Sequence, residues 1–234
     1  MINWIKDTLY YSLIYDNRYK YIIEGLFNTI LIAFFAVIIG IVIGIIISLI
    51  RNYYDNKKKL GILNFLSTCY VNIIRGTPVI LQLMIIYYVI FKSVDINILI
   101  VGILAFGINS GAYVSEIIRS GINSIDKGQM EAGYSLGLKY NTIMKNIILP
   151  QAIKNILPAL GNEFITLLKE TSVGAYIGII ELTKASDIIA SRTYDYFFPL
   201  IIVAIIYLIM TFSLAKLIST LERKFKNAWS KKNK

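Results

Sequence analysis

The sequence predicts an all-α, polytopic membrane protein with five transmembrane helices. Of its 234 residues, 56% are hydrophobic and only 16% are charged, and the mean hydropathy is +0.64. This composition is too apolar for the surface of a water-soluble domain. Apolar stretches long enough to cross a bilayer occur at 22–50 and 199–218. Three further stretches, at 60–91, 96–118 and 155–180, are interrupted by polar residues.

The N-terminal segment, residues 1–21, lacks the continuous apolar core and the cleavage site of a secretory signal peptide, so we expect it to be retained. Apolar residues recur at helical spacing from Ile2 to Leu13. Its aromatic rings suit the headgroup layer, and they belong to Trp4, Tyr10, Tyr11, Tyr15 and Tyr19. We predict an interfacial helix on the outer face, with a disordered tail as the alternative.

Positive charge follows the ends of the predicted spans, and the net charge is +10. It gathers after the first span (Arg51, Lys57, Lys58, Lys59), after the third (Lys127, Lys139, Lys145, Lys154) and in the tail at 221–234 (Arg223, Lys224, Lys226, Lys231, Lys232, Lys234). Lys and Arg resist translocation, so this bias predicts an external N-terminus and a cytoplasmic C-terminus. It favours membrane topology over a nucleic-acid partner.

Close helix packing is predicted in the first and third spans. The first contains Gly40 and Gly44, and the third contains Gly107 and Gly111. This spacing lets two helix backbones approach closely when lipid supplies no hydrophobic drive for association. The glycines can serve packing within the chain or an interface between subunits.

The second span carries a charge and a helix breaker at membrane depth. It reads NIIRGTPVILQL, and Arg75 lies about 22 Å along a helix from the preceding loop. Pro78 cannot donate a backbone bond to Ile74, so we expect a kink or break here. The helical spacing of Asn72, Arg75 and Gln82 predicts one polar face. We assign Asn72, Arg75, Thr77 and Gln82 to a substrate path, with a structural hinge as the alternative.

The third and fourth spans carry polar faces as well. On the third span Asn109, Tyr113 and Glu116 share one helical face, and Glu116 is a counter-charge for Arg75. The fourth span carries a broad polar stripe, made of Asn162, Glu163, Thr166, Lys169 and Glu170. Its predicted path residues are Lys169, Glu170 and Thr171. Charged residues at such depth face a cavity or a partner, which predicts a small bundle around a hydrophilic route.

Several kinds of chemistry are excluded by residues that the chain lacks. It has no histidine and one cysteine, Cys69, so a Cys and His metal site and a structural disulfide are ruled out. No GxxxxGK[ST] motif occurs, so we expect no nucleotide hydrolysis by this chain. We predict no catalytic residue, no metal and no cofactor bound by this chain.

A polar stretch at 126–150 separates the third and fourth spans. Asp126 can cap a helix with Gln129 as its capping-box partner, and Gly137 can end that helix. A second helix would start at Asn141 or Thr142 and break at Pro150. This punctuation favours a docking element in the cytoplasm, and an amphipathic helix on the membrane surface is the alternative.

The same stretch resembles the EAA loop of ABC-transporter permease subunits, in which EAA is followed at fixed spacings by Gly and by Ile-x-Leu-Pro. The matching ATPase-docking residues are Glu131, Ala132, Gly133, Gly137, Leu149 and Pro150. The one departure is Gly133, which stands where the pattern has a third alanine. Glycine keeps the position small at a cost of about 1 kcal/mol in helix propensity.

Three other segments, RGTPVILQL (75–83), NSGAYVSEIIRSGINSIDKGQMEA (109–132) and LLKETSVGAYIGIIEL (167–182), resemble the subfamily that imports histidine, glutamate, glutamine, arginine and opines. The resemblance implies the ABC importer permease (MetI-like) fold over residues 22–220 and a place in the bacterial cytoplasmic membrane. It also implies a second permease subunit, a pair of ATPase subunits that hold ATP and Mg, and an external amino-acid-binding protein.

For the substrate we expect a polar amino acid, with Arg75 facing its carboxylate and Glu116 or Glu170 facing its ammonium group. The two charged groups can instead pair with each other. The alternative function is a gradient-driven transporter or channel subunit for a small polar solute, which would need no docking loop for an ATPase.

Overall fold

The computed structural model describes residues 2–232, and every regular element in this part of the chain is helical. The α-helices are α1 (Ile2–Leu9), α2 (Tyr19–Lys57), α3 (Gly61–Gly76), α4 (Val79–Ile85), α5 (Ile98–Asn123), α6 (Lys127–Ser135), α7 (Tyr140–Ile143), α8 (Leu149–Glu170), α9 (Leu182–Thr193) and α10 (Phe197–Lys232). Shorter π- or 3₁₀-helical turns are η1 (Tyr10–Ile14), η2 (Tyr15–Asn17), η3 (Ile86–Ile90), η4 (Met144–Ile148) and η5 (Thr171–Ile177).

Three of the described helices, α2, α5 and α10, are long and apolar enough to cross a membrane. The bent pair formed by α3 and α4 with η3 adds a fourth span if it is counted as one. The predicted fourth span corresponds to α8, which packs against α5 and α10 but is not among the helices that are apolar enough to cross a membrane. The arrangement fits the predicted five spans, although α8 does not qualify by composition.

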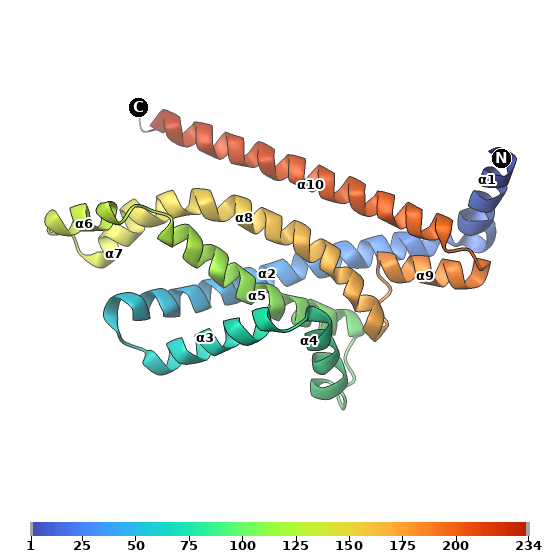
Figure 1. The fold of residues 1–234 in the computed structure, drawn as a ribbon, viewed down its shortest axis with the longest axis horizontal. Helices are drawn as coiled ribbons and strands as arrows, with labels where there is room; N and C mark the ends of the chain where they lie inside the picture. The colour runs from blue at the N-terminus through green and yellow to red at the C-terminus, as the bar shows by residue number, and fades with distance from the viewer. Residues whose placement is uncertain (1, 233–234) are drawn as a thin grey trace.

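The two ends of the bundle differ in the segments that they carry. The C-terminal ends of α2 and α10 lie at one end together with α6 and α7, whereas the N-terminus and α9 lie at the opposite end (Figure 1). The three basic stretches therefore share one end, as the charge bias predicts. Trp4 and the tail residues Lys226, Lys231, Lys232 and Lys234 lie outside the residues whose side chains are described.

The N-terminal segment is helical and contacts α9 through η1. The four described tyrosines of this segment are exposed, as the interfacial interpretation requires. Arg18 is buried, and its Nη1 donates to the carbonyl of Tyr11 over 2.6 Å. Asp16 forms an ion pair with Arg192 of α9 at 3.5 Å. The segment is thus tied to the bundle, which argues against a disordered tail; its contact with lipid stays a prediction.

The most extensive helix packing among the described residues joins α2 to α5, and it depends on glycine. A Cβ atom placed on Gly44 would lie 2.4 Å from Val114 Cγ1, and one on Gly111 would lie 2.7 Å from Ile43 Cγ2. Gly40 and Gly107 meet the facing helix at 2.8 Å in the same way. Both glycine pairs therefore serve packing within the chain, which settles the question that the sequence leaves open.

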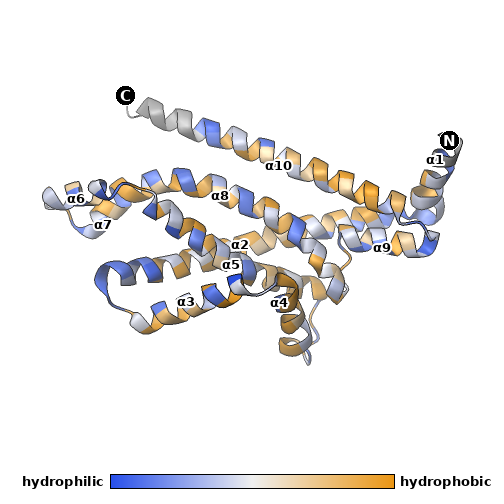
Figure 2. Ribbon diagram, viewed as in Figure 1, coloured by the Kyte–Doolittle hydropathy of each residue, from blue (hydrophilic) through white to orange (hydrophobic). Residues whose placement is uncertain are grey.

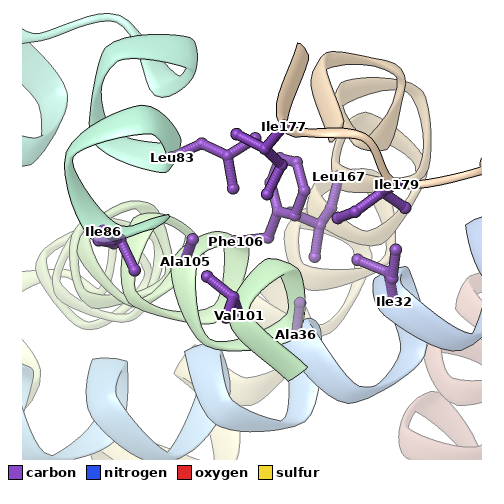
Figure 3. Packing of buried hydrophobic residues seen from close by; sticks show 10 residues of the cluster. All are labelled: Ile32, Ala36, Leu83, Ile86, Val101, Ala105, Phe106, Leu167, Ile177 and Ile179. Carbon is purple, nitrogen blue, oxygen red and sulfur yellow. The ribbon is translucent and has the colours of Figure 1, made fainter. Parts of the chain in front are cut away.

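A hydrophobic core gathers where α2, α4, α5, α8 and η5 meet. Phe106 of α5 is fully buried at its centre, between Leu83 of α4 and Leu167 of α8 (Figure 3). Ile177 and Ile179 reach the same cluster from η5 and the segment after it. This core fixes α4 and the start of α5 against the rest of the bundle.

The second span is broken at the predicted place. α3 ends at Gly76, α4 begins at Val79 after Pro78, and the two helical parts are bent by 111°. The predicted single polar face of Asn72, Arg75 and Gln82 is therefore wrong, because this bend turns Gln82 away from the line of α3. Gln82 is buried, whereas Asn72 is exposed.

We expect Gly44→Val to lower the stability of the protein, because the added methyl groups would overlap Val114 on α5. Overpacking of this kind costs about 1–3 kcal/mol. Thermal unfolding in detergent measures the change. Gly61→Ala is the matched control, since a Cβ there meets Tyr54 at an ordinary 3.8 Å. Equal unfolding temperatures for both variants would contradict this packing.

Candidate functional site

A polar cavity of about 620 Å³ lies between α3, α5 and α8. Its lining consists of Arg75, Tyr113, Glu116, Ile117, Ser120, Gly121, Ser124, Asn155, Ala159 and Glu163. Hydrophilic stretches interrupt the apolar surface along α5 and α8, in contrast to the long apolar middle of α2 (Figure 2). The cavity therefore joins charged side chains from three helices that are distant in sequence.

Glu116 of α5 stands between two arginines. One carboxylate oxygen pairs with Arg51 of α2, and the other lies 3.5 Å from Nη1 of Arg75 on α3. The Arg51 side chain is 11% exposed, whereas that of Arg75 is 45% exposed. The Arg75 guanidinium also lies 5.7 Å from the ring centre of Tyr113. Arg75 and Glu116 thus form the pair that the sequence proposes, with Arg51 as an additional partner.

The opposite wall of the cavity carries a second carboxylate. Glu163 of α8 accepts a hydrogen bond from Ser110 Oγ of α5 at 2.8 Å. This bond uses Oε1 and leaves Oε2 for another partner. The cavity therefore holds a guanidinium on α3 and a separate carboxylate on α8.

Gln82, Thr77 and Asn109 are brought together, but outside the cavity. Gln82 Nε2 donates to the carbonyl of Ile74 at 2.8 Å, the carbonyl that Pro78 leaves without its helical donor, and also contacts Thr77. Asn109 Nδ2 donates to Gln82 Oε1 at 2.9 Å. These side chains satisfy the broken turn, so their geometry supports the hinge interpretation.

The remaining predicted path residues are not part of the cavity lining. Lys169 is exposed near the end of α8, and Glu170 is partly buried beside it. Thr171 is fully buried, and its hydroxyl donates to the carbonyl of Leu168. The polar stripe expected on the fourth span is therefore divided between the cavity and the far end of α8.

The predicted docking segment begins with a capped helix. Asp126 Oδ1 accepts from the Gly128 backbone N–H at 2.7 Å, which confirms the N-cap. The helix ends at Gly137 with φ +73°, a left-handed conformation that favours glycine. Leu138 N donates to Gly133 O, and Gly137 N donates to Tyr134 O, which together form a Schellman motif. Gly137 therefore has the terminating role that the sequence predicts.

The predicted break at Pro150 is wrong. α7 begins at Tyr140, close to the predicted start, and continues through the π-helical turn η4 into α8 without a non-helical residue. In this wide turn Leu149 N bonds to Met144 O, five residues back. The widened turn admits the proline, which lacks a donor, in the first turn of α8. The segment is thus continuous with α8.

Gly133 lies inside the docking segment. It is buried against α7, where an added Cβ would lie 2.7 Å from both Cγ1 and Cδ1 of Ile143. Glu131 and Ala132 are exposed, as are Tyr134 and Leu136. The departure from the EAA pattern therefore has a local cause, because the bulky Ile143 occupies the space that an alanine methyl group would need.

The docking segment also touches the end of α2. Asn56 Nδ2 donates to the Tyr140 hydroxyl at 2.9 Å, and Lys57 Nζ lies 6.0 Å from the centre of the Tyr140 ring. Burial is the main cause that raises the pKa of Tyr140, and Coulombic effects of Tyr134 and Asp55 add to it. The ring is therefore a neutral phenol at physiological pH. Asp55 itself pairs with Arg119 of α5 at 3.1 Å.

Sequence reasoning missed the roles of Arg51 and Tyr140. It counted Arg51 only as a loop charge, whereas the structure includes it in α2. Its distance of 65 residues from Glu116 leaves no local signal of their pairing. Glu163 belongs to the polar stripe predicted on the fourth span, although not to the predicted path residues, and it lines the cavity.

A family model described as binding-protein-dependent transport system inner membrane component matches residues 40–227. A putative glutamine transport system permease protein of Rickettsia prowazekii is 40% identical over 218 residues, which cover 92% of this chain and 98% of the relative. The arginine transport system permease protein of Bacillus subtilis is 41% identical over 209 residues, which cover 88% of this chain and 93% of the relative.

Solved structures agree with these relatives. A chain from the crystal structure of an amino acid ABC transporter with histidines is 44% identical, with a TM-score of 0.81 over 88% of this chain and 94% of that one. A chain of the inward-facing MetNI methionine ABC transporter is 19% identical, with a TM-score of 0.73 over 87% of this chain and 95% of that one. The second likeness shows a shared fold.

We expect Gly133→Val to loosen the docking segment, because its side chain would collide with Ile143. Trypsin cleavage after the exposed Lys139 should then become several-fold faster, which gel electrophoresis of timed digests can measure. The double variant Gly133→Val/Ile143→Ala conserves the total number of side-chain carbons and should restore slow cleavage. If the added Ile143→Ala change gave no relief, the contact would not be the cause.

Proposed function

The chain belongs to the family of binding-protein-dependent transport system inner membrane components and is a permease subunit of an amino acid ABC transporter, and from this premise we propose that it imports a polar amino acid through the cavity between α3, α5 and α8. The observation that carries this proposal is the presence of both charge signs in that cavity. Arg75 lies on one wall and Glu163 lies on another.

An amino acid presents a carboxylate and an ammonium group, and the two walls offer a partner for each. Arg75 is the more exposed arginine of its cluster, so it is the group available to bind the carboxylate. Glu163 retains an oxygen for the ammonium group, whereas Glu116 is already engaged by two arginines. Glu170, the other predicted partner, lies outside the cavity lining. Glutamine and arginine, for which two relatives are named, are the first candidate substrates.

The ATPase would dock on the exposed surface of α6 and its C-cap, which includes Glu131, Ala132, Tyr134 and Leu136. Movement of this segment would pass directly into α8 because α7, η4 and α8 form one continuous helix. Glu163 is carried on that helix. ATP hydrolysis at the partner ATPase subunits, which would hold ATP and Mg, would thus alter the wall of the cavity. Gly133 would not contact the ATPase directly, because it is buried.

The complete importer would contain a second permease subunit, a pair of ATPase subunits and an external amino-acid-binding protein. The end of the bundle with α6 and α7 would face the cytoplasm, and the end with α9 and the N-terminus would face outward. The charge bias of the loops supports this orientation. In a bacterium the chain would then lie in the cytoplasmic membrane.

Glu131→Lys and Gly137→Val should each abolish amino acid uptake while leaving membrane insertion intact. The first reverses an exposed charge of the docking surface, and the second forces a β-branched residue into a left-handed turn. Uptake in reconstituted vesicles and co-purification of the ATPase test both effects. Ser135→Ala is the control, since it changes an exposed residue of the same helix. Normal uptake by both test variants would refute docking at α6.

Arg75→Gln should raise the amino acid concentration that half-maximally stimulates ATP hydrolysis by at least tenfold, a loss of about 1.4 kcal/mol in binding. The physical reason is the loss of the cation that faces the substrate carboxylate. Arg192→Gln removes an ion pair of the same 3.5 Å length at the other end of the bundle and should leave this concentration unchanged. An unchanged value for Arg75→Gln would disprove the carboxylate contact.

A further inference from the structure

Arg51 is not part of the cavity lining, but it forms an ion pair with Glu116, which is. It comes from α2 and pairs with the carboxylate oxygen of Glu116 that Arg75 does not contact, and its side chain is almost completely enclosed. Two guanidinium groups therefore share one carboxylate. The cluster of Arg51, Glu116 and Arg75 carries a net charge of +1.

Removal of Arg51 would leave a neutral cluster. Glu116 would then have Arg75 as its one partner in the cluster, and the attraction of Arg75 for any other anion would fall. Charges in a confined, partly buried site interact more strongly than they do in water. The positive charge that Arg75 can offer to a ligand therefore depends on a residue that does not contact that ligand.

The fold holds Arg51 firmly in this position. α2 and α5 are in contact through the four glycines described above, so Arg51 and Glu116 belong to two helices with little freedom to separate. A second ion pair, between Asp55 and Arg119, joins the same two helices about one turn nearer the docking segment. Arg75 comes from the separate helix α3, and its pairing distance to Glu116 is a longer 3.5 Å.

We propose that Arg51 is a positioning residue for substrate binding: it occupies one oxygen of Glu116 and thereby leaves Arg75 a net positive charge for the carboxylate of the transported amino acid. This inference rests on the proposed function, because it takes Arg75 as the carboxylate partner. It assigns to Arg51 an electrostatic role that is distinct from holding α2 and α5 together.

Variants that change the net charge of the cluster test this proposal. The assay uses the purified complex of permease, ATPase and binding protein, with L-arginine and L-glutamine as probes. Arg51→Gln makes the cluster neutral and should raise the concentration for half-maximal stimulation of ATP hydrolysis at least tenfold. Glu116→Gln makes it +2 and should keep that concentration at or below the wild-type value. The double variant Arg51→Gln/Glu116→Gln returns the cluster to +1 and should lie within about threefold of wild type, where 1.4 kcal/mol corresponds to tenfold.

The rescue separates an electrostatic role from a structural one. If Arg51 only held the helices together, the double variant would bind no better than Arg51→Gln, and that result would overturn the proposal. Arg119→Gln is the matched control, since it removes an ion pair between the same helices outside the cavity lining. Thermal unfolding of all variants identifies any that fail to fold. Arg51→Lys keeps the cluster at +1 and should therefore also lie within about threefold of wild type.

The result for Arg75→Gln distinguishes a failure of the carboxylate contact at Arg75 from a failure of the positioning role of Arg51. If Arg75→Gln weakens binding and Arg51→Gln does not, the carboxylate contact holds and the positioning role of Arg51 is wrong. If neither change weakens binding, the carboxylate contact at Arg75 is itself wrong, and the role of Arg51 is overturned with it.

Discussion

The structure depends on one constraint, which is that a bilayer offers no hydrogen-bond partners to polar groups within it. Each polar side chain at depth must therefore find its partner in the chain. Gln82 supplies the donor that Pro78 lacks, and Asn109 in turn donates to Gln82. Near α9, the fully buried Glu181 accepts bonds from two backbone N–H groups and from the Tyr207 hydroxyl. These hydrogen-bond networks lie where one helix breaks and where another begins. The polar residues that line the cavity are different ones.

Close packing is the second requirement, since lipid does not drive helices together. The glycines of α2 and α5 let the backbones approach until side chains of each helix contact the other. This pair forms a stable frame for the cavity, because Arg51 and Glu116 lie on it. α3 and α8 supply the other walls and carry Arg75 and Glu163. Two of the charged residues thus lie on the tightly packed pair α2 and α5. The other two lie on α3 and α8, which are held by fewer contacts.

Local chemistry could be predicted from the sequence, whereas contacts between distant segments could not. The break at Pro78 and the turn at Gly137 follow from backbone preferences of single residues. The bond of Gln82 to Ile74 could not be foreseen, because it exists only after a bend of 111°. A continuous helix at Pro150 depends on a π-helical turn, for which the sequence has no clear signal. The pairing of Arg51 joins helices that are distant in the chain, and only the packing of α2 on α5 creates it.

The docking segment and the cavity share one continuous run of helix, since α7, η4 and α8 follow one another without a break and α8 lines the cavity. A non-helical connection at Pro150 would absorb a displacement of α6, whereas a helix that continues through Pro150 and contains Pro158 would pass it on to the residues farther along. The same segment contacts α2 through Tyr140 and Asn56, so it touches both the tightly packed pair and the more separate α8. A displacement of the docking segment would therefore act on Glu163 relative to Arg51 and Glu116, and it would change the distance between the opposite charges of the cavity. In the importer proposed above, coupling and substrate recognition would depend on the same arrangement of helices.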